Sequence, residues 1–393
     1  MKNDLDFLFS PEAIRHSAQW IYDLSQKSET HFVLDESKLG STVELVIETI
    51  NKNYPDHNIP FHSRWGHFQV GKIDRISKVN DAFRHKEPME RARCKLDLVI
   101  TSVLLDAGAG KDWFYFEDSS QTKYSRSEGL ALASLYLFLN GTLSRDRQSN
   151  QADVDGLRNL SKADIEKYFQ VTKTNPLVGV QGRLDLLNNL SRAVERKEFF
   201  KDGRPGNIID YLFERYGKNI QAKAILRAVL DGFGPIWPGR EKLNGVNLGD
   251  VWKYKGQLVA FHKLSQWMTY SLIEPIVEAG FRVEGVEELT GLAEYRNGGL
   301  LIDTGILNFK NSKDAATEWA PDSELIIEWR ALTIHYLDVI AELVQQKLNK
   351  SAKDFPLAKV LEGGTWWAGR RLAQEKRTGG DPPIRIKSDA TVF

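Results

Sequence analysis

The sequence predicts a mainly α-helical protein with small β elements at most. Three observations lead to this fold class. Helix-start signals recur along the chain, apolar residues repeat at the three-to-four-residue spacing of a helix, and alternating strand patterns are rare. The chain also shows neither an internal repeat nor a low-complexity linker.

Three predicted helices begin at recognisable start signals. Ser10 followed by Pro11 fits an N-cap with proline at the first helical position. The sequence STVE at 41–44 fits a capping box ahead of an apolar face. In LSKADIEKYF, Ser161 can cap the helix that follows.

Apolar spacing predicts three further helices, over 208–216, 329–343 and 96–105. The last of these, LDLVITSVLL, is apolar almost all round, so we expect a buried helix that is closed by the glycines of GAG. Strand signals are limited to IRIK at 384–387 and LLI at 300–302.

The length and composition describe an ordinary globular protein. The chain has 393 residues, of which 41% are hydrophobic and 10% aromatic, so it can bury a large core. We expect one compact unit over residues 1–393. An alternative is two helical lobes with a boundary near residue 200 and the active site between them.

Charge and cysteine content exclude several classes of function. Lys plus Arg and Asp plus Glu both number 53, which argues against duplex nucleic acid as the main ligand. Cys94 is the only cysteine, so an internal disulfide framework and a cysteine-rich zinc site are excluded. The opening MKNDLDFLFSPEA lacks the apolar run of a signal peptide, and no stretch reaches the roughly 20 apolar residues of a membrane span. We expect a cytoplasmic protein that binds neither nucleic acid nor membrane, and the oligomeric state stays open.

Two stretches resemble cofactor-binding motifs but lack residues that those motifs require. AGAGKD at 107–112 imitates a phosphate-binding loop, but Leu105 stands where the first glycine belongs and Asp112 where Ser or Thr binds magnesium. GFGPIWPG at 232–239 lacks the third glycine of a dinucleotide loop, and the histidines show no HExxH spacing. We therefore expect neither a cofactor nor a metal ion, with a site built from carboxylates alone left open.

Five polar clusters are embedded in apolar sequence and are candidates for a functional site. They are PFHSRWGHFQVGKIDR at 60–75, WFYFEDSSQTKYSRSEG at 113–129, GLAEYRNGGLLIDTGIL at 291–307, IIEWRA at 326–331 and GGTWWAGRR at 363–371. Polar groups need partners once they are buried. We therefore expect residues 60–75, 113–129 and 291–330 to converge on one pocket.

Four of the five clusters also have a purely structural interpretation. Residues 60–75 fit a surface loop pinned by its aromatics. Ser125 and Glu128 fit a capping box for the helix that follows them. Glu294 and Arg296 fit a surface pair at a helix end closed by glycine, and the charges of IIEWRA fit a solvated pair two residues apart.

These segments resemble the uracil-catabolism protein four family, found in fungi and bacteria that degrade uracil through ring-opened ribosyl intermediates. The resemblance rests on FHSRWGHF, the DR at 74 and 75, WFYFEDSS, YSRSEGLALAS, LTGLAEYRNGGLLID, GGTWWAGR and GGDPPIRIKSDATVF, which are spread over residues 61–393. It implies an enzyme that processes ribosylurea.

A more distant similarity is to the queuosine-salvage N-glycosylases, which resemble helical DNA glycosylases in fold. The matched positions are Tyr124-Ser125, Phe261, Lys263 and Gln266, Ala293 to Arg296, and Glu328 with Arg330. Two departures stand out: the family's aspartate in its A-D-Y-R turn is Glu294 here, and the proline that follows is replaced by Gly298-Gly299. Both resemblances imply cleavage of a ribose C1′–N bond, with different leaving groups.

Such cleavage passes through an oxocarbenium-like transition state, which a fixed carboxylate in a dry pocket stabilises. Glu294 is the first candidate, because it occupies the position of the glycosylase aspartate. Asp303, after the apolar LLI, is the second, and Glu328 is the third. Gly298 and Gly299 are expected to let the backbone approach the sugar.

The remaining candidates are expected to bind the substrate, and a 5′-phosphate would suit the planar forks of Arg64, Arg75, Arg126 or Arg370. The full substrate-binding set is Arg64, His67, Asp74, Arg75, Phe116, Glu117, Tyr124, Arg126, Glu128, Arg296, Arg330 and Arg370. The leading hypothesis is a hydrolase that releases urea from ribosylurea or its 5′-phosphate, with a small ribosyl molecule as its partner. The alternative is a non-catalytic protein that senses a nucleotide derivative in a glycosylase-like pocket.

Overall fold

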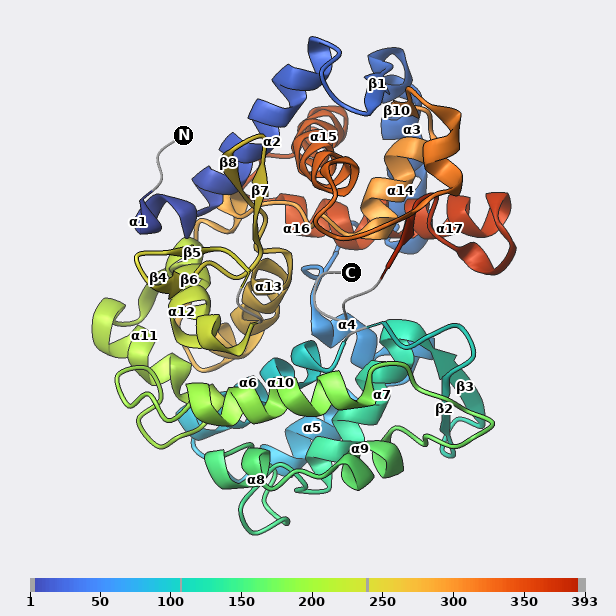
Figure 1. Cartoon of the computed structure of the whole chain (residues 1–393). Coiled ribbons are helices and arrows are strands. Elements are labelled where there is room, and N and C mark those ends of the chain that lie inside the picture. The colour runs from blue at the N-terminus through green and yellow to red at the C-terminus, as the bar shows by residue number, and fades with distance from the viewer. Residues whose placement is uncertain (1–3, 107, 238–239, 388–393) are drawn as a thin grey trace. The chain divides into compact units, whose positions relative to one another are not determined.

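The computed structural model describes residues 4–106, 108–237 and 240–387, and helices form most of its regular structure (Figure 1). Within these residues the strands are two to four residues long, and every sheet has two strands. The prediction of a mainly α protein with small β elements is confirmed. In the same residues no helix combines the length and the apolar character that crossing a membrane requires.

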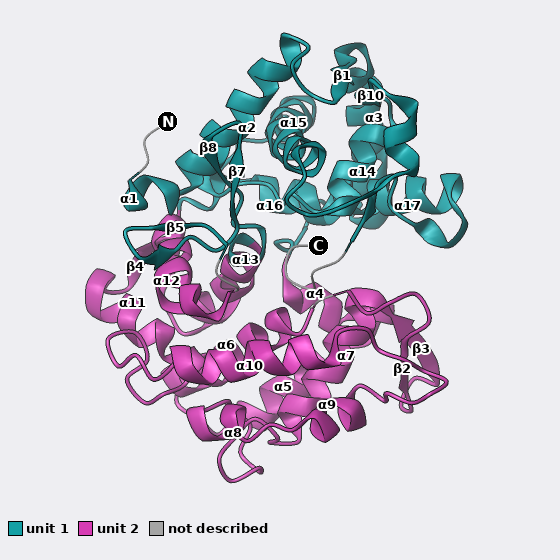
Figure 2. Cartoon of the chain, in the orientation of Figure 1, with its two compact units in different colours: residues 1–62, 239–266, 285–393 teal, residues 63–238, 267–284 magenta. Residues whose placement is uncertain are grey.

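The chain divides into two compact units, each built from segments that are far apart in sequence (Figure 2). Unit 1 comprises residues 1–62, 239–266 and 285–393, and unit 2 comprises residues 63–238 and 267–284. The helix α13 (Lys263–Glu278) begins in unit 1 and continues in unit 2.

Unit 1 is organised around the 25-residue helix α15. Its helices are α1 (Leu5–Leu8), α2 (Pro11–Gln26), α3 (Leu39–Asn53), α14 (Tyr295–Asp303), α15 (Glu324–Leu348), α16 (Leu357–Val360) and α17 (Trp366–Lys376). Its strands are β1 (Phe32–Leu34), β5 (Lys242–Leu243), β6 (Val246–Asn247), β7 (Val251–Tyr254), β8 (Gln257–Ala260), β10 (Leu307–Phe309), β11 (Glu318–Trp319) and β12 (Arg385–Ile386). The helices α2, α3 and α14 all pack on α15, which explains why its apolar residues lie on nearly every side.

Unit 2 is centred on α6 and α7. Its helices are α4 (Arg64–Phe68), α5 (Ile76–Phe83), α6 (Pro88–Leu104), α7 (Arg126–Leu139), α8 (Val154–Arg158), α9 (Lys162–Tyr168), α10 (Val180–Ala193), α11 (Ile208–Tyr216) and α12 (Ala222–Phe233), with most of α13. Its strands are β2 (Phe114–Glu117), β3 (Thr122–Ser125), β4 (Asn219–Gln221) and β9 (Arg282–Glu284). The buried helix expected over 96–105 is the second half of α6, in which residues 96–104 are all buried.

Several predicted elements are confirmed. Ser10 caps α2, with Pro11 at the first helical position, and Ser161 caps α9 through a reciprocal capping box with Asp164. The helices predicted over 208–216 and 329–343 are α11 and part of α15. The strand predicted at 384–387 is β12, which pairs in parallel with β11.

Three local predictions were wrong. The STVE sequence at 41–44 lies inside α3, because the short 3₁₀ helix at 36–38 leads directly into that helix at Leu39. The apolar run at 300–302 belongs to α14 and is not a strand. Ser125 does precede α7, but its side chain makes no capping hydrogen bond within the described residues, so the proposed box with Glu128 does not form.

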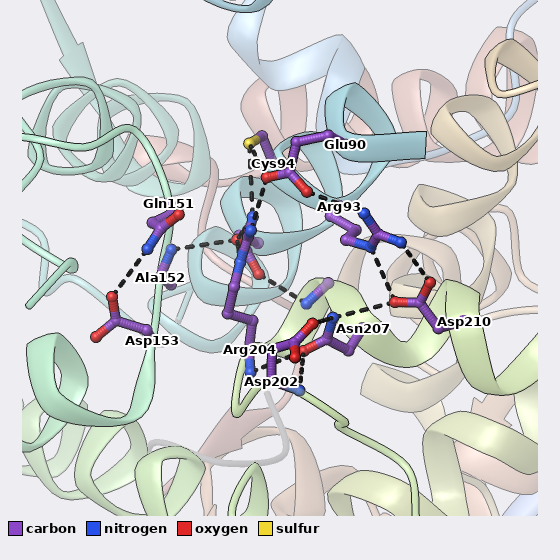
Figure 3. A network of polar contacts seen from close by, with 12 residues as sticks. Glu90, Arg93, Cys94, Gln151, Ala152, Asp153, Asp202, Arg204, Asn207 and Asp210 are labelled. Carbon is purple, nitrogen blue, oxygen red and sulfur yellow. Dashed lines mark hydrogen bonds and ion pairs between the residues drawn. The ribbon is translucent and has the colours of Figure 1, made fainter. Parts of the chain in front are cut away.

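A network of buried polar groups fastens the middle of α6 to the segment before α11 in unit 2 (Figure 3). The Asp97 carboxylate accepts hydrogen bonds from Nε and Nη2 of Arg204, at 2.9 and 2.6 Å, and from the backbone N–H groups of Gly206 and Ala152. Burial raises the pKa of Asp97 to about 6, and the charge of Arg204 opposes this rise. Removing the charge of Arg204 would leave Asp97 buried without its cation, which costs about 3–5 kcal/mol. Arg204 itself also pairs with Glu90, with 2.7 Å between Nη1 and Oε1.

The helix α13 contains Pro275, which cannot donate a backbone hydrogen bond to the carbonyl of Ser271 one turn earlier. In unit 2 the indole Nε1 of Trp65 donates to that carbonyl at 2.9 Å. The hydroxyl of Ser271 in turn accepts from the backbone N–H of Arg64 at 2.9 Å. The side chain of Trp65, on α4, therefore donates the hydrogen bond that Pro275 cannot give to the Ser271 carbonyl.

The helices α14 and α15 approach closely at Gly298. A Cβ atom at this position would lie 2.7 Å from Nε1 and Cε2 of Trp329 and 2.8 Å from Oγ1 of Thr333. The Trp329 indole donates to the Gly298 carbonyl at 3.0 Å. The glycine is thus required by helix packing, which differs from the expectation that it makes room for a sugar.

We predict that Gly298→Ala destabilises the protein by about 1–3 kcal/mol, the usual cost of overpacking a tight contact. The matched control is Gly40→Ala, because Gly40 lies within α3 and a Cβ there meets nothing within 4 Å. That substitution should be neutral or stabilise by up to about 1 kcal/mol. Urea denaturation measures both, and equal free energies of unfolding for the two variants would contradict the packing argument.

Candidate functional site

Glu294 is the N-cap of α14. Its Oε1 accepts a hydrogen bond from the backbone N–H of Asn297 at 2.6 Å, and its Oε2 accepts from the N–H of Arg296 at 2.9 Å. The side chain remains partly exposed. A helix therefore begins at Glu294, where the structural interpretation expected one to finish. The first amides of this helix hold an accessible carboxylate in one orientation.

Aromatic rings and guanidinium groups also pack together at the start of α14, where Tyr295 and Arg296 follow Glu294. The Cζ atom of Arg296 lies 4.3 Å from the ring centroid of Trp366, and Arg296 Nε donates to the Tyr295 hydroxyl at 3.2 Å. Arg370 lies over the same tryptophan at 5.5 Å. Glu294, Tyr295, Arg296, Trp366 and Arg370 are called the α14 cluster below, and all belong to unit 1.

The start of α14 is fixed firmly to α17. The Thr365 hydroxyl donates to Oδ1 of Asn297 at 2.9 Å. A Cβ atom at Gly369 would lie only 2.2 Å from the carbonyl oxygen of Arg296, so the two helices touch at this glycine. The α14 cluster is therefore held on rigid elements, as an oriented catalytic group requires.

Asp303 lies at the other end of α14, where it forms a bidentate ion pair with Arg377. The Nη1–Oδ1 and Nη2–Oδ2 distances are 2.7 and 2.6 Å. The pair fastens the end of α14 to the residues after α17. This arrangement occupies both carboxylate oxygens of the second catalytic candidate.

Glu328 is 1% exposed inside unit 1. Its Oε1 accepts from the Tyr254 hydroxyl at 2.8 Å, and its Oε2 lies 2.7 Å from the backbone N of His31 and 2.9 Å from the His31 Nδ1. Burial, and then the charge of Glu328, raise the pKa of Tyr254. The structural interpretation of a solvated pair in IIEWRA was wrong, because Arg330 is also 1% exposed.

Arg330 forms a bidentate ion pair with Asp250, with Nη1–Oδ1 and Nη2–Oδ2 distances of 2.9 and 2.7 Å. The Phe261 ring lies 4.0 Å below the guanidinium carbon. Burial alone would raise the pKa of Asp250; the charge of Arg330 and hydrogen bonds from it and from Trp252 outweigh burial and lower the pKa. Arg330 and Phe261, two of the positions matched to the queuosine-salvage N-glycosylases, thus lie together beside Asp250, a carboxylate that the sequence analysis did not single out.

In unit 2, Arg75 and Glu117 form a second buried pair. Nε of Arg75 donates to Oε1 of Glu117 at 2.6 Å and Nη2 donates to Oε2 at 2.5 Å. Arg75 Nη1 also donates to the carbonyl oxygens of Phe68 and Val70, and Tyr136 donates to Glu117 at 2.9 Å. The nitrogen atoms of Arg75 that would bind a phosphate therefore already donate hydrogen bonds within unit 2.

Arg64 is also buried in unit 2, and burial lowers its pKa. Its Nε donates to the Ser102 hydroxyl at 2.7 Å, and its Nη1 lies 3.3 Å from Oδ1 of Asp106. The guanidinium carbon is 5.6 Å from the Trp267 ring centroid, and the His67 ring lies against the same indole at 5.6 Å. Two of the aromatic and basic candidates from 60–75 therefore meet at Trp267.

The other unit 2 candidates occupy three settings. Asp74 is exposed and accepts from the N–H and hydroxyl of Ser77 at the start of α5. Phe116 is half-buried on β2, whereas Tyr124 on β3 is buried with its ring 5.5 Å from the Arg75 guanidinium carbon. At the start of α7, Arg126 has a left-handed φ of 54° and is half-buried, and Glu128 is buried.

The structure thus groups the candidates within each unit. Glu294, Arg296 and Arg370 meet at the α14 cluster, Glu328 and Arg330 lie on α15, and the candidates of 64–128 belong to unit 2. Sequence reasoning missed Asp250, Tyr254 and Trp366. The only local signal for the first two is an acid followed by the alternating VWKY, and Trp366 lies in the quoted GGTWWAGRR. Within the described ranges no group of three or more His, Cys, Asp or Glu side chains could hold a metal ion.

Comparison with known proteins identifies the family. The family model described as "Protein of unknown function (DUF1688)" matches residues 7–393, so the chain belongs to this family. The protein named "Uracil catabolism protein 4" from Lachancea kluyveri is 35% identical over 441 residues, covering 100% of this chain and 99% of that protein. "Protein urg3" from Schizosaccharomyces pombe (strain 972) is 37% identical over 402 residues, covering 98% of each chain. The resemblance to the uracil-catabolism protein four family is confirmed, and the likeness to queuosine-salvage glycosylases stays a prediction.

The Glu117 pair generates a pH-dependent prediction. Burial alone would raise the pKa of Glu117, but hydrogen bonds from Arg75, Ser120 and Tyr136 and the charge of Arg75 lower it to about 2 from 4.5. A carboxylate with a lowered folded-state pKa stabilises the fold above its unfolded pKa, and this contribution is lost as pH falls from about 4.5 towards 2. The shift corresponds to about 3 kcal/mol.

We therefore expect Glu117→Gln to lose less stability than the wild type when the pH falls from 4.5 to 3. Urea denaturation at pH 7, 4.5 and 3 gives the free energies of unfolding that test this difference. The control is Asp118→Asn, because Asp118 is the exposed neighbour of Glu117; it should keep the wild-type pH dependence. Parallel profiles for all three proteins would show that the pair does not set acid stability.

Proposed function

We propose that this protein acts in uracil degradation as a hydrolase that cleaves the ribose C1′–N bond of ribosylurea or its 5′-phosphate. Water supplies the oxygen that bonds to C1′, the C1′–N bond breaks, and urea leaves with a proton on its nitrogen. Support for the pathway comes from the relative named "Uracil catabolism protein 4", which matches over the full length of both chains. The name of that relative specifies neither the bond that breaks nor the leaving group.

The observation that carries the proposal is the fixed carboxylate of Glu294. It is partly exposed, and both of its oxygens are oriented by backbone amides at the start of α14. Each oxygen keeps a further lone-pair direction, since an ionised carboxylate has about four acceptor sites. Such a group can face the positive charge that grows on C1′ and the ring oxygen, and can orient the attacking water.

The rest of the α14 cluster supplies what a poor leaving group requires. Urea accumulates negative charge as the bond breaks, so hydrogen-bond donors must lie close to it. Arg296 lies against Trp366, and the Tyr295 hydroxyl accepts from Arg296 Nε, which leaves its own proton to donate. In this proposal Glu294 stabilises the sugar cation, while Tyr295 and Arg296 stabilise the departing urea.

The direct test is an assay of free urea. Purified protein is incubated separately with ribosylurea and with its 5′-phosphate. Catalytic release of urea from either supports the hydrolase. Saturable binding of both without release would instead indicate the alternative, a non-catalytic protein that senses a nucleotide derivative.

We predict that Glu294→Gln lowers turnover by roughly 10²–10³, the range observed when one preorganised charge-stabilising group is removed. Substrate affinity should change far less, because the lost interaction belongs mainly to the transition state. Glutamine keeps the size of the side chain and one acceptor oxygen for the helix cap. Its loss of stability should stay near 1 kcal/mol, the usual value of an N-cap.

The control for this capping effect is Asp35→Asn in unit 1, since Asp35 accepts from the N–H of Ser37 as the cap of a 3₁₀ turn. It should lower stability slightly and leave urea release unchanged. Near-normal turnover of the Glu294→Gln variant would move the catalytic role to Asp303 or Glu328. A variant that unfolds would assign Glu294 a structural role alone.

A further prediction concerns the 5′-phosphate. Arg126 begins α7, a 14-residue helix whose N-terminal amides and dipole favour an anion. We expect Arg126→Ala to weaken binding of ribosylurea 5′-phosphate at least tenfold more than binding of ribosylurea. Calorimetric titration with the two compounds measures this difference, and Arg370→Ala is the parallel variant in the α14 cluster. An equal loss for both compounds would assign Arg126 to folding or to sugar contacts.

A further inference from the structure

Unit 2 contains a cavity of about 380 Å³. None of the candidate site residues lines it. It is lined by α5, the first two turns of α6 and the last turn of α13, through Asn80, Arg84, Pro88, Arg91, Ala92, Lys95, Pro275, Glu278 and Ala279. Its size lies within the range of about 300–1,000 Å³ that is usual for small-molecule sites.

The lining of this cavity is strongly basic. Arg84, Arg91 and Lys95 contribute three positive charges and Glu278 contributes one negative charge, so the described lining has a formal net charge of +2. Lys95 is buried and pairs with Glu278, which is half-exposed. A buried ammonium is costly without an anion beside it, and Glu278 is the anion that Lys95 has in this structure. The ammonium of Lys95 is therefore a place in the cavity wall where negative charge is stabilised.

Two arginines add side-chain donors that have no partner among the residues that the structure describes. Arg84 is exposed and Arg91 is half-buried, and neither guanidinium makes a hydrogen bond or ion pair with another residue of the described chain. Both line the same cavity. Planar guanidinium groups bind phosphate oxygens in pairs of hydrogen bonds, so two such groups around one cavity favour a phosphate ligand.

The start of α6 provides a third, independent feature. The helix is 17 residues long, begins with Pro88, and has no side-chain cap within the described residues. Pro88, Arg91, Ala92 and Lys95 form one face of its first turns, so the positive end of the helix dipole lies beside the cavity. Uncapped amides at a helix start are ready donors to an anion.

We propose that this cavity binds a small organic phosphate, with the phosphate between Arg84 and Arg91 and near the ammonium of Lys95. Glu278 competes with the phosphate for Lys95. The site uses no residue of the α14 cluster, so it goes beyond the proposed hydrolysis and provides a place where a phosphorylated metabolite can act on the protein.

The test is isothermal titration of the full chain with ribose 5-phosphate, with inorganic phosphate, and with ribose as the neutral control. We expect saturable binding of both phosphates and none of ribose. The double variant Arg84→Ala/Arg91→Ala should bind phosphate at least tenfold more weakly, because each arginine supplies charge-assisted hydrogen bonds. The matched control Arg192→Ala removes an exposed arginine of α10 in the same unit and should change affinity less than twofold.

A second variant tests the role of Glu278. Glu278→Gln removes the carboxylate that competes for Lys95, so phosphate should bind severalfold more tightly. Tighter binding supports the proposal, and weaker binding by this variant contradicts it.

Three results would overturn the proposal. Absence of phosphate binding at millimolar concentration is one, and unchanged affinity in the double variant is another. The third is loss of binding on Arg126→Ala or Arg370→Ala but not in the double variant, because the phosphate would then be held by substrate-binding candidates. Urea release is measured separately, so failure of this site leaves the proposed hydrolysis untouched.

Discussion

The structure depends on pairing charges that its helices bury. Each unit holds ionised groups in its interior that would be costly alone: Asp250 with Arg330 in unit 1, and Asp97 with Arg204 in unit 2. Both pairs have additional hydrogen bonds from the backbone or from side chains, which is the condition under which buried ions are tolerated. The pairs also fix geometry, because a planar guanidinium can donate two hydrogen bonds to one carboxylate in only a few orientations. Segments that are distant in sequence are thereby locked in one register.

Much of the fold could be predicted from the sequence because it follows local rules. Caps such as Ser10 and Ser161 act within one helical turn, and the apolar spacing of α11 and α15 reports the face that each helix buries. The errors arose where the local signal is ambiguous. The run at 300–302 is too short for its period to be read, and its helical state is decided six residues earlier, by the cap at Glu294.

The candidate site could be predicted only in part. The sequence singled out the acids and bases of 291–307 and 326–331, and the structure shows that Glu328 and Arg330 are buried where charge is rarely placed. Their partners could not be foreseen, because Tyr254 and Asp250 lie 74 and 80 positions earlier and no spacing rule connects them. The role of Gly298 likewise depends on Trp329, a contact that only the packing of two helices reveals.

The interleaved chain of the two units has a consequence for synthesis on the ribosome. Residues 63–284 contain all of unit 2, so this unit can close once they have emerged, whereas the first 62 residues must wait for partners near the other end of the chain. Strand β1 pairs with β10, Phe32 opposite Phe309, and α2 packs on α15. Because chains emerge and fold from the N-terminus onward, the side of α2 that packs on α15 stays uncovered until residues 324–348 have been made. Unit 1 is therefore the part of the nascent protein that most needs protection by chaperones.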